Sequence, residues 1–276
     1  MAIWRDGQGL EYARAYTSDG ESWIAWKNLA TFAFSDGAGE VRAWPEPGVP
    51  GDRVADVFER VVQPIVLQAI GCQALHASAI AGEGGVLAFC GVGHSGKSTI
   101  AYALGQRGYR QVADDALVMK VSPGRIAVRP LPFAPSLRPA SRLHFETQRS
   151  AVGNDHVHQP NPVDDGLPLK AVFILRQDAR LSAPAGPDRL SPVQAFSALL
   201  THAHCFDETS SAHTRRLAED YLTVAGQIPV MTLTYPPHFA QIEWLLRLVE
   251  RAAETAGATP FAASLVSDAE PAVSYR

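Results

Sequence analysis

One short stretch constrains this chain more than any other, because residues 91–98 follow the pattern Gly-x4-Gly-Lys-Ser. Glycines let a backbone curl so that successive N–H groups point inward at an anion, and a following helix adds the positive end of its dipole. An apolar run over residues 86–89 precedes the stretch and a helical pattern follows it, as a phosphate-binding loop requires. The pattern predicts a loop of the Walker A type, with an incidental glycine-rich turn as the alternative.

Two side chains at the end of this stretch have the chemistry that a nucleotide needs. The ammonium of Lys97 is expected to bridge the terminal phosphates, and the hydroxyl of Ser98 to bind the magnesium ion that spreads charge between them. ATP and Mg2+ are therefore the expected cofactors. The residues expected to bind the nucleotide are Gly91, Gly93, His94, Ser95, Gly96, Lys97, Ser98 and Thr99.

Two adjacent acids, Asp114 and Asp115, end the apolar run that follows the predicted helix. Carboxylates beside a phosphate loop can divide the work, one holding magnesium and the other accepting the proton of an attacking hydroxyl. Paired aspartates are also common in helix caps and turns, and this structural interpretation stays open. The pair favours chemistry over simple nucleotide binding, since a binding module needs no base.

Apolar runs and turn residues divide the chain into three parts. Residues 1–51 mix short aromatic runs with turn pairs such as Asp36-Gly37, which predicts a small β-rich N-terminal lobe. Residues 52–256 open with a helical pattern and then alternate strand, loop, helix and strand, so we expect an α/β catalytic domain. Residues 257–276 form a tail without a pattern.

Within the catalytic domain the strongest patterns fix several elements and one loop. Residues 148–168 are polar and rich in proline, and we expect a surface loop there. The expected strands are residues 74–81, 85–90, 110–113, 169–175 and 229–233, and the expected helices are 98–108, a helix opening at Ser191-Pro192, and 239–253.

Composition limits the partners of the chain. With 46% hydrophobic and 19% charged residues it is typical of globular proteins, and a net charge of -4 offers no basic field to nucleic acid. The sequence lacks an apolar run of membrane-spanning length, a signal-peptide core and a disulfide framework. We therefore expect a cytoplasmic protein without nucleic-acid or membrane partners, and leave a homo-oligomer open.

The sequence around the loop resembles the catalytic domain of HPr kinase/phosphorylase, with phosphoenolpyruvate carboxykinase as a more distant relative. The matching residues are Leu75-His76-Ala77-Ser78-Ala79, Gly85-Val86-Leu87, the loop itself, Leu104, Arg107-Gly108-Tyr109 and Val112-Ala113-Asp114-Asp115. The resemblance is specific over about residues 72–118 and diffuse as far as residue 250. It implies a P-loop kinase core of the HPr kinase type with a mixed sheet.

The resemblance also implies roles for single residues. Asp114 would be the general base toward a serine hydroxyl, and Asp115 and Ser98 would hold magnesium. His76 is similar to the family's histidine near the transferring phosphate, although a satisfied histidine at a strand end is an equal alternative on residue chemistry alone. The expected catalytic residues are thus Asp114, Lys97 and His76. His94 departs from the family, whose members commonly carry glycine at this position.

A second departure bears on the substrate. The family's Glu-Ile-Arg-Gly stretch is replaced by the proline-bounded residues 132–139, which include Arg138. Divergent HPr-kinase-like proteins include kinases of ribosomally made peptides, among them lasso-peptide precursors phosphorylated on serine. The expected function is transfer of the γ-phosphate of ATP to a serine of a peptide or small protein. A small-molecule kinase and a nucleotide-binding regulatory module are the alternatives.

Other candidate residues carry weaker signals. His202 and His204 are one residue apart in an expected helix, which would point their rings apart, so we do not predict a metal site there. His156 and His158 lie in the expected surface loop, where solvated histidines are common. Arg138 could face the phosphates or lie on the surface, and both interpretations stay open.

Overall fold

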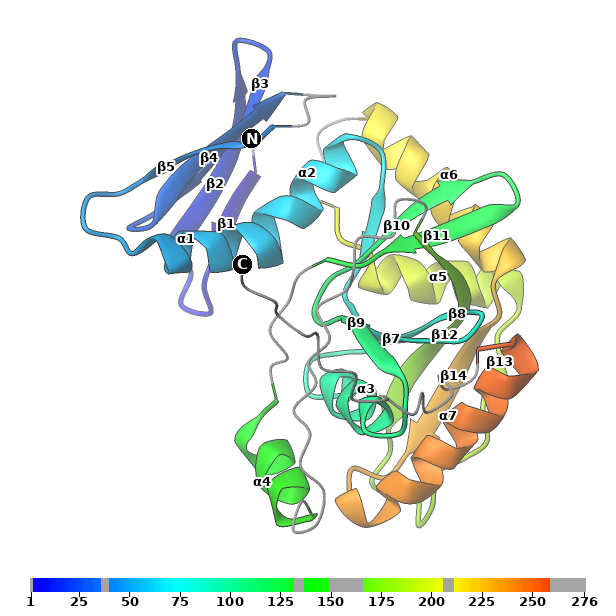
Figure 1. Cartoon of the computed structure of the whole chain (residues 1–276). Coiled ribbons are helices and arrows are strands. Elements are labelled where there is room, and N and C mark those ends of the chain that lie inside the picture. Colours follow the sequence, from blue (N-terminus) through cyan, green and yellow to red (C-terminus); the bar gives the residue numbers. More distant parts are fainter. Residues whose placement is uncertain (1, 36–39, 132–136, 149–165, 206–210, 259–276) are drawn as a thin grey trace, which may run out of the picture.

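The computed structural model describes residues 2–35, 40–131, 137–148, 166–205 and 211–258. Within them a small antiparallel sheet adjoins a larger unit in which helices cover a mixed sheet (Figure 1). The expected α/β class, mixed sheet and N-terminal β-rich lobe are confirmed. Residues 149–165 of the expected surface loop, with His156 and His158, and residues 259–276 of the tail lie outside the described residues.

The N-terminal sheet has five strands in chain order, each antiparallel to the next. Side chains alternate between its faces, so that Ile24 and Phe32 enter a core while Trp23 and Trp44 lie on the other face. The two tryptophan rings stack with centroids 5.4 Å apart across the intervening strand. The strands are β1 (Ala2–Arg5), β2 (Glu11–Ser18), β3 (Glu21–Trp26), β4 (Ala30–Ser35) and β5 (Arg42–Pro45).

A continuous helical stretch packs on this sheet. It consists of α1 (Gly51–Val57), the π-helical turn η1 (Phe58–Val62) and α2 (Gln63–Ala69). The π turn lies directly before Pro64, whose missing N–H interrupts the α-helical ladder. Buried Val54, Val62 and Ile65 join the core of the lobe. The domain boundary after residue 51 stays a prediction, and the helices that follow it share a core with the lobe.

The larger unit is built on a nine-stranded sheet with a spine of order β6-β10-β11-β12-β8-β7-β9. Its long strand β12 runs parallel to β8 and β14 and antiparallel to β11. The strands are β6 (Gln73–Leu75), β7 (Ala77–Gly82), β8 (Gly85–Cys90), β9 (Arg110–Ala113), β10 (Leu117–Ser122), β11 (Arg125–Arg129), β12 (Leu167–Gln177), β13 (Asp188–Arg189) and β14 (Val230–Tyr235).

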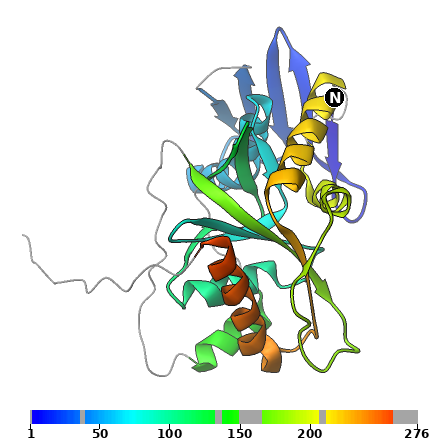
Figure 2. The ribbon, with the colours of Figure 1, turned by 90° about the vertical axis from the view of Figure 1, so that its right-hand side faces the viewer.

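Helices cover both faces of this sheet (Figures 1 and 2). Along β8 the side chains of Val86 and Ala88 enter a core shared with α5 (Pro192–His202) and α6 (Ser211–Gln227). The alternating Leu87 and Phe89 enter a second core shared with α3 (Lys97–Gly105) and α7 (Ile242–Ala256). The strand is therefore buried on both faces, as its unbroken apolar sequence predicts.

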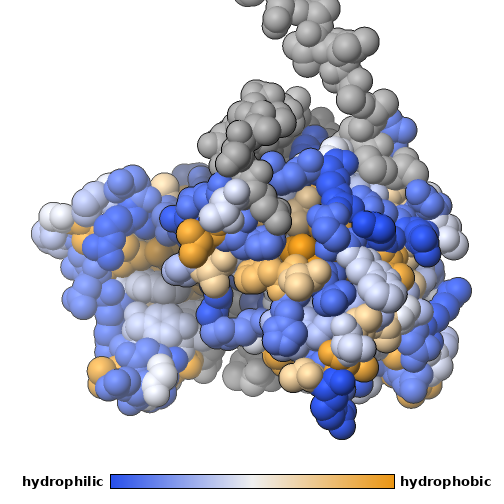
Figure 3. All heavy atoms as spheres, turned by 90° about the horizontal axis from the view of Figure 1, so that it is seen from below, coloured by the Kyte–Doolittle hydropathy of each residue, from blue (hydrophilic) through white to orange (hydrophobic). Residues whose placement is uncertain are grey.

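The lower end of the molecule carries α4 (Pro139–Gln148) and the start of α7, which follows the short helix η2 (Phe239–Gln241). Seen from below, apolar side chains gather in the middle of this face and hydrophilic ones surround them (Figure 3). Among the described residues, no helix combines the length and apolar character needed to cross a bilayer.

The structure differs from the sequence-based expectation in three places. The single strand expected over residues 74–81 is two strands, because the N–H of His76 leaves the ladder and donates to the carbonyl of His202 at 2.7 Å. The hairpin of β10 and β11 turns at Pro123-Gly124, and α4 begins at Pro139 inside a stretch that looked only proline-rich. Proline suits the first turn of a helix, whose leading N–H groups lack intrahelical partners.

The packing between β8 and β12 yields a first prediction. Phe173 is fully buried on β12, and its ring stacks on Phe89 with centroids 5.6 Å apart. Phe173→Ala should lower the free energy of unfolding by about 3–5 kcal/mol, through lost burial and the cavity left behind. Val193→Ala, at a position 78% exposed on α5, should change it by no more than about 0.5 kcal/mol. Urea denaturation followed by circular dichroism measures both, and equal effects would contradict this account of the core.

Candidate active site

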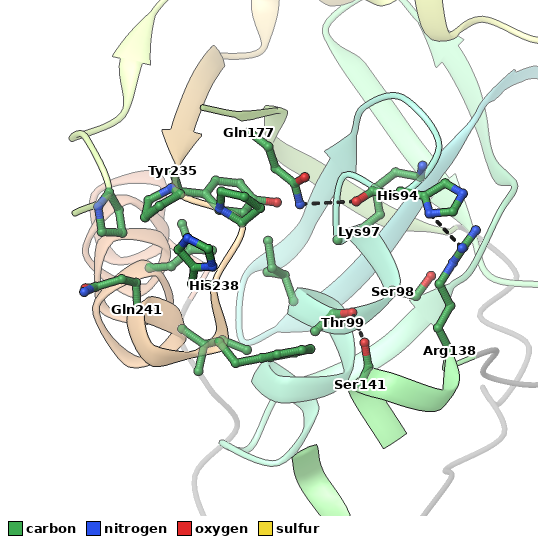
Figure 4. A pocket seen from close by; sticks show the side chains of 18 of the residues that line it. His94, Lys97, Ser98, Thr99, Arg138, Ser141, Gln177, Tyr235, His238 and Gln241 are labelled. Carbon is green, nitrogen blue, oxygen red and sulfur yellow. Dashed lines mark hydrogen bonds between the residues drawn. The ribbon is translucent and has the colours of Figure 1, made fainter. Parts of the chain in front are cut away.

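A cavity of about 590 Å3 opens where β8 gives way to α3. Residues of the glycine-rich loop form one side of it, and residues that follow β14 form the other (Figure 4). The start of α4 and the end of β12 complete the wall. The side chains labelled in Figure 4 are His94, Lys97, Ser98, Thr99, Arg138, Ser141, Gln177, Tyr235, His238 and Gln241.

The loop between β8 and α3 is held in shape from outside. The hydroxyl of Tyr235 on β14 donates to the carbonyl of Ser95, and Nε2 of Gln177 on β12 donates to the carbonyl of His94 at 3.2 Å. Gly96 takes a left-handed conformation with φ 88° directly before α3. This turn points the first N–H groups of α3 toward the cavity, where an anion would satisfy them.

Lys97 begins α3 and is only 7% exposed. Its ammonium donates to the carbonyls of Gly91 at 3.0 Å and Val92 at 3.4 Å, so it lies against its own loop. Burial lowers the pKa of Lys97, and the nearby carboxylate of Asp115 opposes that effect. A buried ammonium beside the first N–H groups of a helix is a strong attractor for phosphate oxygens.

Asp114 follows β9 and contacts two hydroxyls. Its Oδ1 accepts hydrogen bonds from Ser98 at 2.7 Å and from Ser78 of β7 at 2.6 Å. The resemblance paired Ser98 with Asp115 as magnesium ligands, whereas the structure brings Ser98 to Asp114. Strand β9 ends at Ala113, and Asp115 has a left-handed backbone that the sequence does not announce, so the sequence could not decide between the two acids.

Asp115 lines the cavity in a left-handed conformation with φ 67°. Non-glycine residues in this region are strained, and they concentrate at functional sites. Nδ1 of His76 donates to the Asp115 carbonyl at 3.1 Å, and the ring of His204 also hydrogen-bonds to the Asp115 backbone. The conformation thus aims the carboxylate into the cavity while two imidazoles hold the main chain behind it.

The sequence missed His204 because of a wrong helix boundary. Helix α5 ends at His202, so the helical spacing used to separate the two rings does not apply to His204. Its N–H donates to the carbonyl of Ala74, and its ring meets that of His76 edge-on with centroids 5.8 Å apart. Burial lowers the pKa of both His202 and His204. Across the described part of the chain, no group of three or more His, Cys, Asp or Glu residues is arranged to hold a metal ion.

The end of the cavity away from Lys97 is largely apolar and was also missed. The sequence predicted only a strand and a helix there, and the cavity wall comes from the turn between them. His238 and Gln241 add polar groups to this end (Figure 4). The apolar lining consists of Ile100, Pro184, Tyr235, Pro236, Pro237, Phe239, Ile242 and Leu245.

Two contacts bring the start of α4 to the loop. Oγ1 of Thr99 lies 2.9 Å from Oγ of Ser141, and Nη1 of Arg138 lies 2.7 Å from Nδ1 of His94. Arg138 therefore lines the cavity with an exposed side chain, and its role toward phosphate stays a prediction. The side chain of Ser95 is buried against Gly91 instead of facing the cavity.

Comparison with known proteins gives distant structural matches and no sequence match. No protein-family model matches the chain, and no curated protein sequence matches it. The fold is similar to the structure of the HPr(Ser) kinase/phosphatase from Coxiella burnetii, with a TM-score of 0.36 and 15% sequence identity over 66% of this chain and 92% of that one. At this distance the functional assignment depends on the geometry of the cavity itself.

The loop geometry yields a second prediction. A Cβ atom on Gly96 would lie 3.0 Å from the Tyr235 hydroxyl, at a backbone conformation that side chains rarely adopt. Gly96→Ala should lower the free energy of unfolding by about 1–2 kcal/mol. Gly105→Ala, in the same helix with open space around it, should leave it unchanged or raise it by up to about 1 kcal/mol. Thermal melting of both variants checks the difference, and a harmless Gly96→Ala would show that the loop is not locked.

Proposed function

We propose that this chain is a magnesium-dependent kinase that transfers the terminal phosphate of ATP to a hydroxyl acceptor. The observation that carries the proposal is the contact between the Ser98 hydroxyl and Asp114, beside Lys97 and at the N-terminus of α3. A glycine turn or a helix cap would explain the loop or the acids separately. Neither explanation accounts for the contact between the serine that follows the lysine and a carboxylate at the end of β9.

The shape of the cavity supports a nucleotide as the phosphate donor. One end presents an ammonium and free helix N–H groups, and the other presents apolar side chains with a few polar groups. A nucleotide has the same division, since its phosphates are charged and its base is flat, apolar on its faces and polar at its edge. A volume of about 590 Å3 is within the range of cavities that hold molecules of this size.

Ser98 and Asp114 are the residues that would hold magnesium. The hydroxyl of Ser98 donates a hydrogen bond to Asp114, so the lone pairs of its oxygen stay available to a cation. Hydroxyl and carboxylate oxygens are ligands that Mg2+ prefers. Bound there, magnesium would supply positive charge between the phosphates that separate during transfer.

Asp115 is the better candidate for the general base. Its carboxylate is exposed to the cavity, whereas that of Asp114 is committed to two hydroxyls. In the transfer, the acceptor oxygen bonds to the γ-phosphorus, the bond from that phosphorus to the bridging oxygen breaks, and ADP leaves. The acceptor proton passes to Asp115. This division of roles is the reverse of the one that the family resemblance implied.

For the acceptor we propose a serine of a peptide or small protein, such as a ribosomal peptide precursor. This choice is supported by the residues around His76, Ser78 and the two aspartates that resemble the HPr kinase family. Incubation with γ-labelled ATP and an arrayed serine-peptide library tests it. Labelled peptides would support the proposal, whereas label found only in inorganic phosphate or in a metabolite would favour the regulatory module or the small-molecule kinase.

Lys97 gives the direct test of phosphotransfer. Lys97→Ala should reduce transfer about a hundredfold or more, because it removes a preorganised charge that acts on phosphate oxygens. Lys120→Ala, which removes an exposed lysine from β10, should keep the parent rate. Initial rates with labelled ATP measure both variants, after melting curves have shown that they fold. Parent-like turnover by folded Lys97→Ala would remove the loop from the active site.

The two aspartates form a matched pair that separates magnesium binding from base catalysis. Asp115→Asn should lower the transfer rate about 10²–10⁴-fold without moving the magnesium concentration for half-maximal rate. Asp114→Asn should raise that concentration, because it weakens the metal site. Magnesium titrations of both variants decide the matter. A shifted titration in Asp115→Asn alone would restore the assignment with Asp114 as the base.

A further inference from the structure

His94 has a conformation that needs a reason. It lies in the left-handed region with φ 70°, which glycine adopts without strain and which few other residues adopt, histidine being one of the commoner of them. Its side chain is exposed, so burial of the ring does not explain the residue. The conformation instead brings Nδ1 to within 2.7 Å of Nη1 of Arg138 (Figure 4).

The chemistry of this contact fixes the state of the imidazole. A guanidinium has five N–H donors and no acceptor, so Arg138 must donate and Nδ1 of His94 must accept. In this contact Nδ1 is the acceptor, so the ring N–H is on Nε2. A protonated ring would lose the acceptor and place a second positive charge beside Arg138. The titratable and charged groups that face the pair across the cavity are Lys97, Asp115, His76 and His238.

Arg138 is held close to the phosphate end of the cavity. It directly precedes α4, whose Ser141 contacts Thr99 two residues after Lys97. Burial is the main influence that lowers the pKa of Lys97, and the positive charge of Arg138 adds to it. The positive charges of Arg138 and Lys97 therefore repel each other, and an anion entering the cavity would offset this repulsion.

We propose that Arg138 binds the terminal phosphate of the nucleotide, and that His94 is the positioning residue that holds its guanidinium at the cavity. The inference rests on the proposed function and adds a residue that the loop pattern does not contain. One N–H of Arg138 is used by His94, and the remaining donors keep the planar fork that suits two phosphate oxygens at once. A lysine could not serve in the same way, since its ammonium is a point charge.

Calorimetric titration of the full chain with ATP and with ADP, both with Mg2+, tests the role of Arg138. Arg138→Met keeps an unbranched apolar stem and removes the guanidinium with its charge. It should weaken ATP binding about tenfold or more and ADP binding less than about threefold, because only ATP carries the terminal phosphate. Arg142→Met, at an exposed position in the first turns of α4, should leave both affinities at the parent values. Both positions are exposed, so both variants should fold.

His94 requires two variants, because its backbone and its side chain act separately. His94→Gly relieves the strained backbone but removes the acceptor, and should weaken ATP binding in the same direction as Arg138→Met. His94→Asn suits the left-handed conformation and keeps an acceptor near the place of Nδ1, so it should retain most of the ATP affinity. Combined with Arg138→Met, His94→Gly should cause no further loss of ATP affinity.

The outcomes are distinguishable. If the parent protein binds neither nucleotide, the proposed function fails and the role of Arg138 fails with it. If the parent binds ATP and Arg138→Met loses equal affinity for ATP and ADP, the nucleotide site stands and the terminal-phosphate role is overturned. If His94→Gly costs as much affinity in the Arg138→Met background as in the parent, His94 does not act through Arg138.

Discussion

The carboxylate of Asp114 accepts hydrogen bonds from two hydroxyls, Ser78 on β7 and Ser98 on α3, and much of the site depends on this contact. A half-buried carboxylate needs donors, because leaving a charge unpaired away from water is unfavourable. Here the donors come from a strand and a helix, so the two hydrogen bonds to the carboxylate also fix the position of α3 against the sheet. Strand β9, which delivers Asp114, pairs directly with β7.

Hydrogen bonds to its backbone carbonyls also fix the conformation of the glycine-rich loop. Four of its carbonyl oxygens accept hydrogen bonds: Gln177 and Tyr235 donate to those of His94 and Ser95, and Lys97 donates to the other two. Carbonyl oxygens would repel a phosphate, and N–H groups attract it. With these carbonyl oxygens already hydrogen-bonded, the loop presents its N–H groups to the cavity. The strands β12 and β14 therefore contribute to anion binding although they do not belong to the loop motif.

Sequence reasoning located the loop, its flanking strand and helix, and the acid pair, because each depends on residues close together in the chain. It could not assign the two aspartates, since Asp115 takes a left-handed conformation that no local pattern announces. It missed His204 and the apolar end of the cavity for a different reason. Both come from the last third of the chain. The N–H of His204 pairs with the carbonyl of Ala74 in β6, and the turn after β14 reaches the loop through the long-range pairing of β12, β8 and β14.

The uneven distribution of tryptophan along the chain makes its intrinsic fluorescence sensitive mainly to one part of the molecule. Four of the five tryptophans, Trp4, Trp23, Trp26 and Trp44, lie on strands of the N-terminal sheet, and two of them stack. The fifth, Trp244, lies half-exposed on α7 of the larger unit. Indole fluorescence of the intact chain therefore reports mainly on the lobe. Replacing Trp244 with phenylalanine would leave an emission signal from the lobe alone. The melting of the small sheet could then be followed separately from that of the larger unit.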